Sequence, residues 1–525
     1  MEIGAKANAD RFPDRTAVVS GELRSTWKEW NGRMCQLARA LLALGLAPGD
    51  KISVLLHNCP EFLEVANAVS KARLVMVPLN YRLRGREIEY IVKDSDSRMI
   101  FFGAEFAAEL EPVLSEIPGL ISGGAVMVGG SGEEPGRPDS ARRLTRYEEL
   151  LAAQPETEPD LELDVQGSPP GQTMMIYTSG TTGRPKGVDR PTPRDPELLI
   201  GVARGFGLQW GSEVHLVPAP LYHGAPTLGV FLTIALGGTL VLMERFDAER
   251  FLALVEAERI TSTFVVPTML QRILALPEDA KGRYDLSSLR SLIVGAAPLP
   301  LSTKLAAISY FGPCLYEYYG STDAGLNTIL SPAEQLTRPA SCGRVLPGNH
   351  IKILGDNGTE LPRGEIGDIY VTSSMARTTR YYKDPEKTRQ AFRGEYMTVG
   401  DMGYLDEDDY LYLVDRKADM VISGGVNVYP AEIEEVIHGH PAVLDVAVIG
   451  VPNEDWGEEL KALVQLKEGT RATAKEILGL CRDRLADYKT PRSVDFVVEI
   501  PRNPSGKILK RQIRAPYWEG RERLI

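Results

Sequence analysis

The feature that most constrains the fold is an alternation of strand-like and helix-like segments through the first 120 residues. An apolar stripe at helical spacing predicts a helix over Thr26–Leu46, and the run KISVLL predicts a buried strand over Lys51–Leu56. A second helix is expected over Glu61–Lys71 and a second strand over Leu74–Pro78. Strands that alternate with helices in this way favour an α/β fold built on a parallel sheet.

Further along the chain, the alternation of strands and helices continues and is then followed by a region of short strands. Apolar runs predict strands over Val214–Pro218, Ser262–Val266 and Ser291–Val294. From Asn349 onward, short strands separated by turns predict a β-rich subdomain at about residues 340–415. The expected strands of this part are Ile351–Leu354, Gly367–Thr372 and Tyr410–Val414.

The last hundred or so residues carry a small α/β pattern of their own. The expected elements are a helix over Ala431–His438, strands over Asp445–Ile449 and Leu460–Leu466, a helix over Ala474–Leu485 and a strand over Val494–Val498. The charged Asp415-Arg416-Lys417 precedes this pattern, so we expect a large N-terminal domain, residues 1–415, and a small mobile C-terminal domain, residues 416–525. The fold class is therefore α/β, with parallel and mixed sheets and helices in the large domain.

One long uncharged segment raises the question of a membrane span. No Asp, Glu, Lys or Arg occurs from Val214 to Met243. Several prolines and the pair Gly237-Gly238 interrupt this segment, whereas a span needs roughly 20 mainly apolar residues. We therefore expect a buried helix over Thr227–Leu236 and a buried strand over Thr239–Met243, with no membrane span.

Charge and cysteine content exclude other classes of function. The chain has 59 basic and 71 acidic residues, a net charge of −12, which argues against nucleic acid as a partner. Its five cysteines form no CxxC pair, and with histidine they show no zinc-ligand spacing, so we expect a reducing compartment, the cytoplasm. The N-terminus lacks the apolar core of a signal peptide, and the pair His438 and His440 is expected at a solvated helix end.

Glycine is the unusual component, with 50 of 525 residues, and it is concentrated in clusters. The first cluster is Tyr177-Thr-Ser-Gly-Thr-Thr-Gly-Arg-Pro-Lys-Gly-Val188, directly after the apolar Met174–Ile176. Backbone N–H groups at glycines, hydroxyl groups and one lysine together suit a polyphosphate. The string is not a Walker A loop, because Lys186 stands between Pro185 and Gly187. The competing interpretation is a flexible turn.

The cluster resembles the phosphate-binding signature of the adenylate-forming superfamily, which includes acyl-CoA synthetases, luciferases and peptide-synthetase adenylation domains. The resemblance extends to further motifs and covers nearly the whole chain. It implies ATP contacts from Thr178, Ser179, Gly180, Thr181, Thr182, Gly183 and Lys186. It further implies an adenine pocket at Gly295, Ala296 and Ala297, and ribose contacts from Asp401 and Arg416.

Tyr319-Gly-Ser-Thr-Asp323 resembles the family's Tyr-Gly-x-Thr-Glu motif. The resemblance implies that Tyr319 stacks on adenine beside Gly320 and that Thr322 meets the α-phosphate. It also implies that Asp323, with Thr181, holds Mg²⁺, directly or through water, because Asp is one methylene shorter than the usual Glu. The competing interpretation makes Asp323 a helix N-cap.

Two motifs near the C-terminus resemble the mobile part of the family's site. Pro501–Ile508 is similar to the loop that carries the catalytic lysine, which is Lys507 here, whereas Lys510 and Arg511 are expected to be solvated. Met420–Glu434 is similar to the loop that lines the tunnel for the pantetheine arm of CoA. The implied CoA-binding residues are Ser423, Gly424 and Gly425, and the candidates for the hinge are Asp415 and Lys417, because Ala418 occupies one candidate place.

Pro220-Leu-Tyr-His-Gly-Ala-Pro226 matches the family motif in which an aromatic residue or histidine gates the acyl entrance. His223 is accordingly a second catalytic candidate, with core packing as the alternative. Small neighbours suggest a roomy acyl pocket that includes His223, Gly224, Ala225 and Ala324.

The resemblance implies an ATP- and Mg²⁺-dependent acid–CoA ligase. It would take a small-molecule carboxylic acid. Pro220–Pro226 is also similar to the motif of bacterial ligases for bulky acids, so the resemblance favours a medium- or long-chain fatty acid or a steroid- or bile-acid-like substrate. An acyl-AMP ligase that loads a carrier protein, an aryl-CoA ligase and a catalytically inactive binding protein are the alternatives. The sequence leaves a monomer and a homodimer open.

Overall fold

The computed structural model describes residues 2–130, 144–159, 174–178, 185–190, 195–423, 426–453, 456–503 and 506–519. The chain divides into two compact units. Unit 1 comprises Met1–Val265, Leu276–Ile293 and Ser374–Phe392, and unit 2 comprises Val266–Ala275, Val294–Ser373 and Arg393–Ile525. The boundary predicted between residues 415 and 416 falls within unit 2 and stays a prediction.

The first sheet of unit 1 has the strand order β19-β9-β8-β4-β3-β5-β6-β7. The pairs from β8 through β7 are parallel, whereas β9 is antiparallel to both β8 and β19. The strands are β3 (Lys51–Leu55), β4 (Val75–Pro78), β5 (Ser97–Gly103), β6 (Ala125–Val128), β7 (Thr145–Arg146), β8 (Met174–Thr178), β9 (Lys186–Arg190) and β19 (Arg380–Tyr381). A mostly parallel sheet needs helices on both faces, and this one has them.

Unit 1 also contains strands in the order β13-β12-β10-β11-β1-β2. They are β1 (Thr16–Ser20), β2 (Leu23–Thr26), β10 (Val214–Val217), β11 (Thr239–Leu242), β12 (Ser262–Val265) and β13 (Ser291–Val294). Strand β10 is parallel to β11 and β12, β1 is parallel to β11, and β1 forms an antiparallel hairpin with β2.

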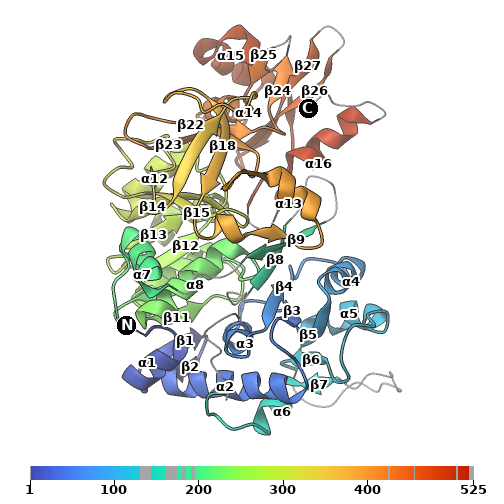
Figure 1. The fold of residues 1–525 in the computed structure, drawn as a ribbon. Helices are drawn as coiled ribbons and strands as arrows, with labels where there is room; N and C mark the ends of the chain where they lie inside the picture. Colours follow the sequence, from blue (N-terminus) through green and yellow to red (C-terminus); the bar gives the residue numbers. More distant parts are fainter. Residues whose placement is uncertain are drawn as a thin grey trace. The chain divides into compact units, whose positions relative to one another are not determined.

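Helices α2 (Trp27–Ala43) and α3 (Pro60–Lys71) fill the core that both sheets of unit 1 share (Figure 1). A capping box fixes the start of α2, because Thr26 Oγ1 accepts the Glu29 N–H while the Glu29 carboxylate accepts the Thr26 N–H. The fully buried Trp27 and Trp30 of this helix belong to the core cluster that also contains strand residues of both sheets. Helices α4 (Gly85–Asp94) and α5 (Ala107–Leu114) cover the other face of the first sheet.

The first half of unit 2 is rich in strands. Helix α12 (Leu301–Phe311) leads into the antiparallel hairpin of β14 (Leu315–Ser321) and β15 (Gly325–Leu330), to which β16 (Arg344–Val345) is added. A second sheet contains β17 (His350–Leu354), β18 (Gly367–Thr372), β21 (Tyr396–Met397), β22 (Asp401–Leu405) and β23 (Leu411–Arg416).

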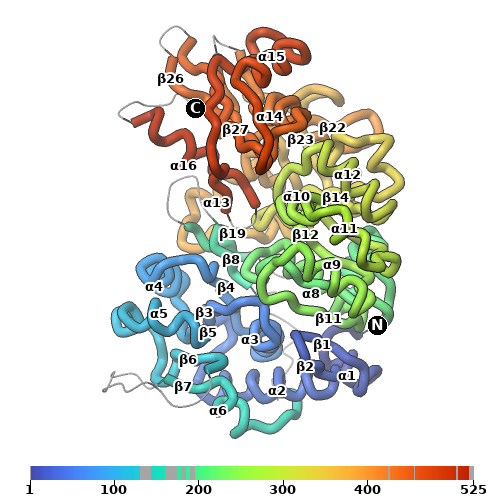
Figure 2. Tube along the Cα trace, turned by 180° about the vertical axis from the view of Figure 1, so that it is seen from behind, coloured from blue at the N-terminus to red at the C-terminus, as the bar shows by residue number. Residues whose placement is uncertain are grey.

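The C-terminal part of unit 2 has a sheet of its own. It contains β24 (Val421–Ser423), β25 (Val426–Val428), β26 (Val443–Asn453), β27 (Gly457–Leu466) and β28 (Ser493–Phe496). Helices α14 (Pro430–His438) and α15 (Ala474–Arg484) pack on one face through Ile433 and Ile477 (Figure 2). The other face is covered by Ile500 and by Ile513 of α16 (Lys510–Arg514).

The α/β fold class is confirmed, and most predicted elements lie within a few residues of the observed ones. One strand differs in a way that matters. Strand β23 continues through Asp415 and Arg416, which were expected to follow it, because both residues pair with β22 at Met402 and Asp401. The uncharged Val214–Met243 segment forms β10, helix α8 (Gly224–Leu236) and β11, and no described helix is long and apolar enough to cross a membrane.

Candidate active site

The two ends of the phosphate-loop signature lie on neighbouring antiparallel strands of unit 1. Strand β8 ends at Thr178, strand β9 begins at Lys186, and these two residues are directly paired. The hairpin therefore fixes Thr178 opposite Lys186. The predicted contacts Ser179, Gly180, Thr181, Thr182 and Gly183 lie outside the described residues.

Lys186 pairs with an acidic residue from a distant part of unit 1. Its Nζ lies 3.1 Å from Oδ2 of Asp384, the N-cap residue of helix α13 (Pro385–Ala391). The hydrogen bond to Asp384 raises the pKa of Lys186 above its ordinary value. The ammonium group is therefore held in its charged form next to the hairpin base, as a phosphate contact requires.

In unit 2, three residues from separate motifs form one hydrogen-bonded group. The Tyr319 hydroxyl donates to Oδ2 of Asp401 at 2.9 Å, and Nε of Arg416 lies 3.1 Å from Oδ1 of the same carboxylate. The cross-strand pairing of Asp401 with Arg416 places the two ribose candidates side by side. Tyr319 is 6% exposed, and burial, followed by the Asp401 charge, keeps its pKa well above the usual range. Its hydroxyl is therefore a donor, and its predicted stacking on adenine stays a prediction.

The segment predicted to line the adenine pocket follows β13. A side chain at Gly295 would place its Cβ 2.5 Å from the Tyr318 ring, so only glycine fits there. Ala296 has a φ of +69°, a left-handed conformation that is costly for a residue with a Cβ. Ala296 is exposed and Ala297 is half-buried, so this strained turn presents small side chains and backbone at the surface of unit 2.

Gly320 lies near the end of β14, and the turn that leads to β15 contains Thr322, Asp323 and Ala324. A Cβ at Gly320 would lie 2.5 Å from the Gly325 carbonyl oxygen, which explains the glycine at this irregularity in the hairpin. Strand β15 follows the turn directly, so the alternative interpretation of Asp323 as a helix N-cap is wrong.

The chemistry of the turn suits magnesium. In the described part of the chain, no group of three His, Cys, Asp or Glu residues could hold a metal by itself. Mg²⁺ is commonly bound through one or two carboxylates, water and substrate phosphates. Asp323, whose Oδ1 is buried in the turn, fits this role as a single oxygen ligand.

Lys507 lies on a tight loop near the Asp401 and Arg416 pair. Its N–H donates to Oδ1 of Asn503 at 2.8 Å, and the preceding Gly506 has a φ of +81°. Burial and the neighbouring Arg416 lower the pKa of Lys507 to about 8, while Asp401 opposes this shift. Unit 2 thus brings the predicted catalytic lysine into the electrostatic environment of the predicted ribose contacts.

Two family models match the chain. Residues 5–382 match the model described as AMP-binding enzyme, and residues 432–507 match the AMP-binding enzyme C-terminal domain. The chain belongs to the AMP-binding enzyme family. Its relatives are named as CoA ligases and synthetases, which makes it an enzyme of the acyl-CoA synthetase branch.

Curated relatives and solved structures match this AMP-binding enzyme over almost its full length. A feruloyl-CoA synthase of Amycolatopsis sp. is 35% identical over 507 residues, covering 96% of each chain. The long-chain-fatty-acid–CoA ligase FadD13 of Mycobacterium tuberculosis is 33% identical over 498 residues, covering 95% of this chain and 94% of FadD13. The structure of the anthranilate CoA ligase AuaEII in complex with anthranoyl-AMP superposes with a TM-score of 0.86 at 27% sequence identity, covering 98% of this chain and 97% of AuaEII.

Sequence reasoning missed the residue that anchors the lysine loop. Arg502 donates through Nε and Nη2 to the two oxygens of Asp445 at 2.8 and 2.7 Å, and it also donates to the Gly506 carbonyl. Arg502 belongs to the Pro501–Ile508 motif, but the motif does not indicate its partner Asp445, which lies 57 residues earlier on β26. His438 belongs to the same group, with Nε2 3.7 Å from Asp445. It was expected to be solvated, but its side chain is only 10% exposed.

Lys510 was also expected to be solvated, and this expectation is wrong. Lys510 is 8% exposed, and its Nζ lies 2.8 Å from Oε1 of Glu434 on α14. Although burial opposes it, the charges of Glu434 and Asp415 raise the pKa of Lys510. The lysine is buried because two carboxylates from separate elements surround it, whereas Arg511 is exposed as predicted.

The two hinge candidates have different surroundings. Oδ2 of Asp415 accepts the Ala431 N–H at 3.0 Å, and burial raises the pKa of this carboxyl to about 6. Lys417 pairs at 3.1 Å with Asp356 and at 2.9 Å with Asp368. Both residues are therefore fixed by specific contacts, and their role as a pivot stays a prediction.

The proposed CoA and acyl residues are described only in part. Ser423 ends β24 opposite Val426, whereas Gly424 and Gly425 lie outside the described residues. His223 is the N-cap of α8, which begins with Gly224 and Ala225, and Ala324 is 2% exposed. Burial, with a smaller effect from Arg82, lowers the pKa of His223 to about 4. Its imidazole is therefore neutral at physiological pH.

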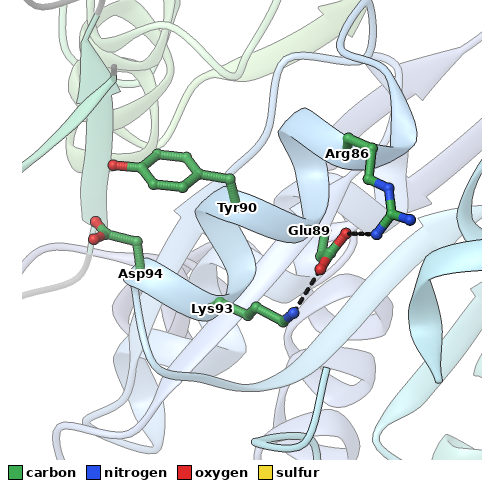
Figure 3. Close-up of a pocket in the computed structure, with 5 residues that line it drawn as sticks. All are labelled: Arg86, Glu89, Tyr90, Lys93 and Asp94. Atoms are coloured by element: carbon green, nitrogen blue, oxygen red, sulfur yellow. Dashed lines mark hydrogen bonds and ion pairs between the residues drawn. The ribbon is translucent and has the colours of Figure 1, made fainter. Parts of the chain in front are cut away.

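A shallow depression on α4 lies beside the base of the phosphate loop (Figure 3). It is lined by Arg86, Glu89, Tyr90, Lys93 and Asp94. Glu89 pairs with both Arg86 and Lys93, at 2.7 and 2.5 Å, so these charges satisfy one another. Tyr90 donates to the Pro185 carbonyl, and Asp94 accepts the Tyr177 hydroxyl at 2.6 Å. Tyr90 and Asp94 of α4 therefore hold the two strands that bear the loop.

Proposed function

We propose that this AMP-binding enzyme joins a carboxylic acid to CoA in two steps. In the first step, a carboxylate oxygen attacks the α-phosphorus of ATP, which gives acyl-AMP and pyrophosphate. In the second step, the CoA sulfur attacks the acyl carbon and AMP leaves, while the thiol proton passes to solvent. Activation is needed because a carboxylate is a poor electrophile, whereas AMP is a good leaving group.

The observation that carries this proposal is the position of Lys507 near Asp401 and Arg416. With a pKa of about 8, Lys507 is mostly an ammonium group at neutral pH. Carboxylate and ATP repel each other, and a positioned cation between them stabilises the charge that is shared in the transition state. We assign Lys507 to this role in the first step.

The remaining residues bind and orient the nucleotide. Asp401 and Arg416 are assigned to the ribose, Tyr319 to the adenine and Lys186 to the phosphates. Asp323 would hold Mg²⁺, which supplies further neutralisation of phosphate charge when bound. For the second step, we propose that the small C-terminal domain turns about Asp415 or Lys417 and brings the loop of Ser423, Gly424 and Gly425 to the thiol.

The acid is the open part of the proposal. The relatives named for ferulate and anthranilate point to aromatic acids, whereas FadD13 is named for long-chain fatty acids. The predicted medium- or long-chain or bulky acid and the aryl alternative both remain, so the choice depends on the residues of this chain. Since none of the five cysteines forms a disulfide, we also propose a reducing compartment, the cytoplasm.

The test is a panel of carboxylic acids scored by AMP release with and without CoA. The proposal expects one class of acid to support AMP release that depends on CoA and yields a thioester. Release that requires a carrier protein instead of CoA would favour the acyl-AMP ligase alternative. No acid-dependent release with either acceptor would contradict the proposal.

A further inference from the structure

A group of five rings that includes His223 lies in unit 1. We call it the ring cluster and define it as His57, Tyr81, Phe106, Tyr222 and His223. The ring centroids of His57 and Tyr81 are 4.3 Å apart, and those of Tyr222 and His223 are also 4.3 Å apart. Tyr81 meets Tyr222 edge-on at 5.2 Å, and Phe106 lies 5.2 Å from His57. The cluster is therefore continuous.

Three buried polar atoms of the ring cluster have no hydrogen-bond partner among the described residues. They are Nδ1 of His57, the hydroxyl of Tyr222 and Nε2 of His223. His57 and Tyr222 are 8% and 4% exposed. A buried polar group without a partner is costly, so a concentration of three in one cluster points to a ligand that supplies the partners.

The contacts of His57 determine which kind of partner is missing. Nη2 of Arg245 lies 3.3 Å from Nε2 of His57, and an arginine can only donate. Burial and the Arg245 charge lower the pKa of His57, so the ring is neutral. Oε1 of Glu105 lies 3.8 Å from the same Nε2, which is too far for a hydrogen bond, so we assign Nε2 as the acceptor from Arg245 and the proton to Nδ1. Because the Tyr222 hydroxyl is also a donor, the cluster presents two unsatisfied donors that require an acceptor oxygen.

The rings determine the rest of the ligand. Aromatic edges and faces favour another ring in offset or edge-to-face contact, so they suit an aromatic acid better than a flexible alkyl chain. Tyr81, Phe106 and His223 are half-buried, whereas His57 and Tyr222 are buried, so the half-buried rings form the accessible side of the cluster. A saturated fatty chain in this position would leave both donors of His57 and Tyr222 without partners.

We infer that the acid activated by this enzyme is an aromatic carboxylic acid whose ring bears an oxygen substituent, and that His57 and Tyr222 donate hydrogen bonds to that oxygen. The inference rests on the proposed function. It adds the substrate class and assigns specificity to His57, which no motif includes, and to Tyr222, which precedes His223 in the acyl-entrance motif.

The test compares matched acids in acid-dependent ATP–pyrophosphate exchange. The pair is 4-hydroxycinnamate and cinnamate, with decanoate as the alkyl acid. A hydrogen bond that satisfies a buried donor corresponds to roughly a tenfold change in kcat/KM, so the hydroxylated acid is expected to exceed cinnamate by about that factor. Tyr222→Phe and His57→Phe should each reduce this ratio about fivefold, because kcat/KM should fall more for the hydroxylated acid than for cinnamate.

Tyr284→Phe is the matched control, because it removes the same atom from a half-buried ring outside the cluster, where the Tyr284 hydroxyl donates to Glu249 at 3.3 Å. It should leave the ratio unchanged. Tyr222→Phe should not lower the melting temperature of the free enzyme, since it removes an unpaired hydroxyl. That readout separates specificity from a structural role.

Three results would overturn the inference while leaving the proposed function intact. They are equal kcat/KM for the two cinnamates, a preference for decanoate, and a loss in the Tyr222 and His57 variants that is the same for every acid. The last result would indicate contact with the carboxylate common to all acids. Absence of exchange with any acid would instead contradict the proposed function itself.

Discussion

Replacing Lys510 tests whether the buried cation supports the catalytic loop. Lys510→Met removes the charge but keeps much of the apolar stem, and it leaves Glu434 and Asp415 buried without their shared cation. Removing one partner of a buried ion pair costs about 3–5 kcal/mol. We expect a loss of this size in local stability, and slower adenylation because α16 begins three residues after Lys507.

The matched variants separate charge from packing. Glu434→Gln keeps an oxygen that accepts the Val448 N–H, now at 2.6 Å, while removing the carboxylate charge. The double variant Lys510→Met/Glu434→Gln should therefore recover part of the lost stability. Lys475→Met makes the same lysine change on the exposed part of α15 and should stay within about 0.5 kcal/mol of the original protein.

Native-state hydrogen exchange of the amides in α14 and α16 is the assay, since it reports the free energy of local opening without requiring two-state unfolding of the whole chain. If Lys510→Met changed that free energy no more than Lys475→Met, the buried-cation reasoning would be refuted.

Other residues give predictions of their own. Arg502→Lys keeps the charge but loses the bidentate contact with Asp445. Adenylation should therefore slow about tenfold, while thioester formation from supplied acyl-AMP should change little. Equal losses in both steps would argue against a role of Arg502 in positioning Lys507. Asp384→Asn keeps the acceptor that caps α13 but removes the charge that pairs with Lys186. Because Lys186 is then free to pair with phosphate, titration with ATP should show affinity increased up to about fivefold, the range of an exposed ion pair. Weaker ATP binding would mean that Asp384 positions Lys186 for phosphate. The ammonium form of Lys507 is lost as pH rises through its pKa of about 8. The kcat/KM for exchange should therefore be constant below pH 8 and fall about tenfold per pH unit above it. A kcat/KM that rises through pH 8 would exclude the ammonium form as the active one.

The sequence predicted elements well where the signal is local. The strand over Ser291–Val294 was predicted with its observed bounds. The start of the helix at Trp27 was predicted within one residue from its apolar stripe, whereas its end was predicted at Leu46 and lies at Ala43. Short apolar runs with helix and turn signals carry this information without long-range contacts.

Residues whose environment depends on distant partners were not predictable in the same way. Lys510 reads as a surface lysine until Glu434, 76 positions earlier in the numbering, is placed 2.8 Å away. Asp415 and Arg416 were expected to follow the strand that ends at Val414, but their pairing with Met402 and Asp401 of β22 makes them part of β23. Charged residues are normally exposed, so a sequence alone favours the solvated interpretation of each.

The site shows the same division. The motifs named Tyr319, Asp401 and Arg416 individually, and the structure supplies the hydrogen bond and the ion pair that join them. His57 carries no motif, and only its contacts with Tyr81 and Arg245 reveal an unsatisfied donor. Residue type and spacing thus indicate chemistry, whereas pairing, burial and protonation require the folded arrangement.

The most direct test of the central claim is carboxylate-dependent ATP–pyrophosphate exchange by Lys507→Ala, measured beside thioester formation from supplied acyl-AMP and CoA. The account predicts that exchange falls by at least about a hundredfold, on the scale of a lost transition-state contact, while thioester formation from acyl-AMP continues. Undiminished exchange in a folded Lys507→Ala protein would contradict the assignment of Lys507 to adenylation.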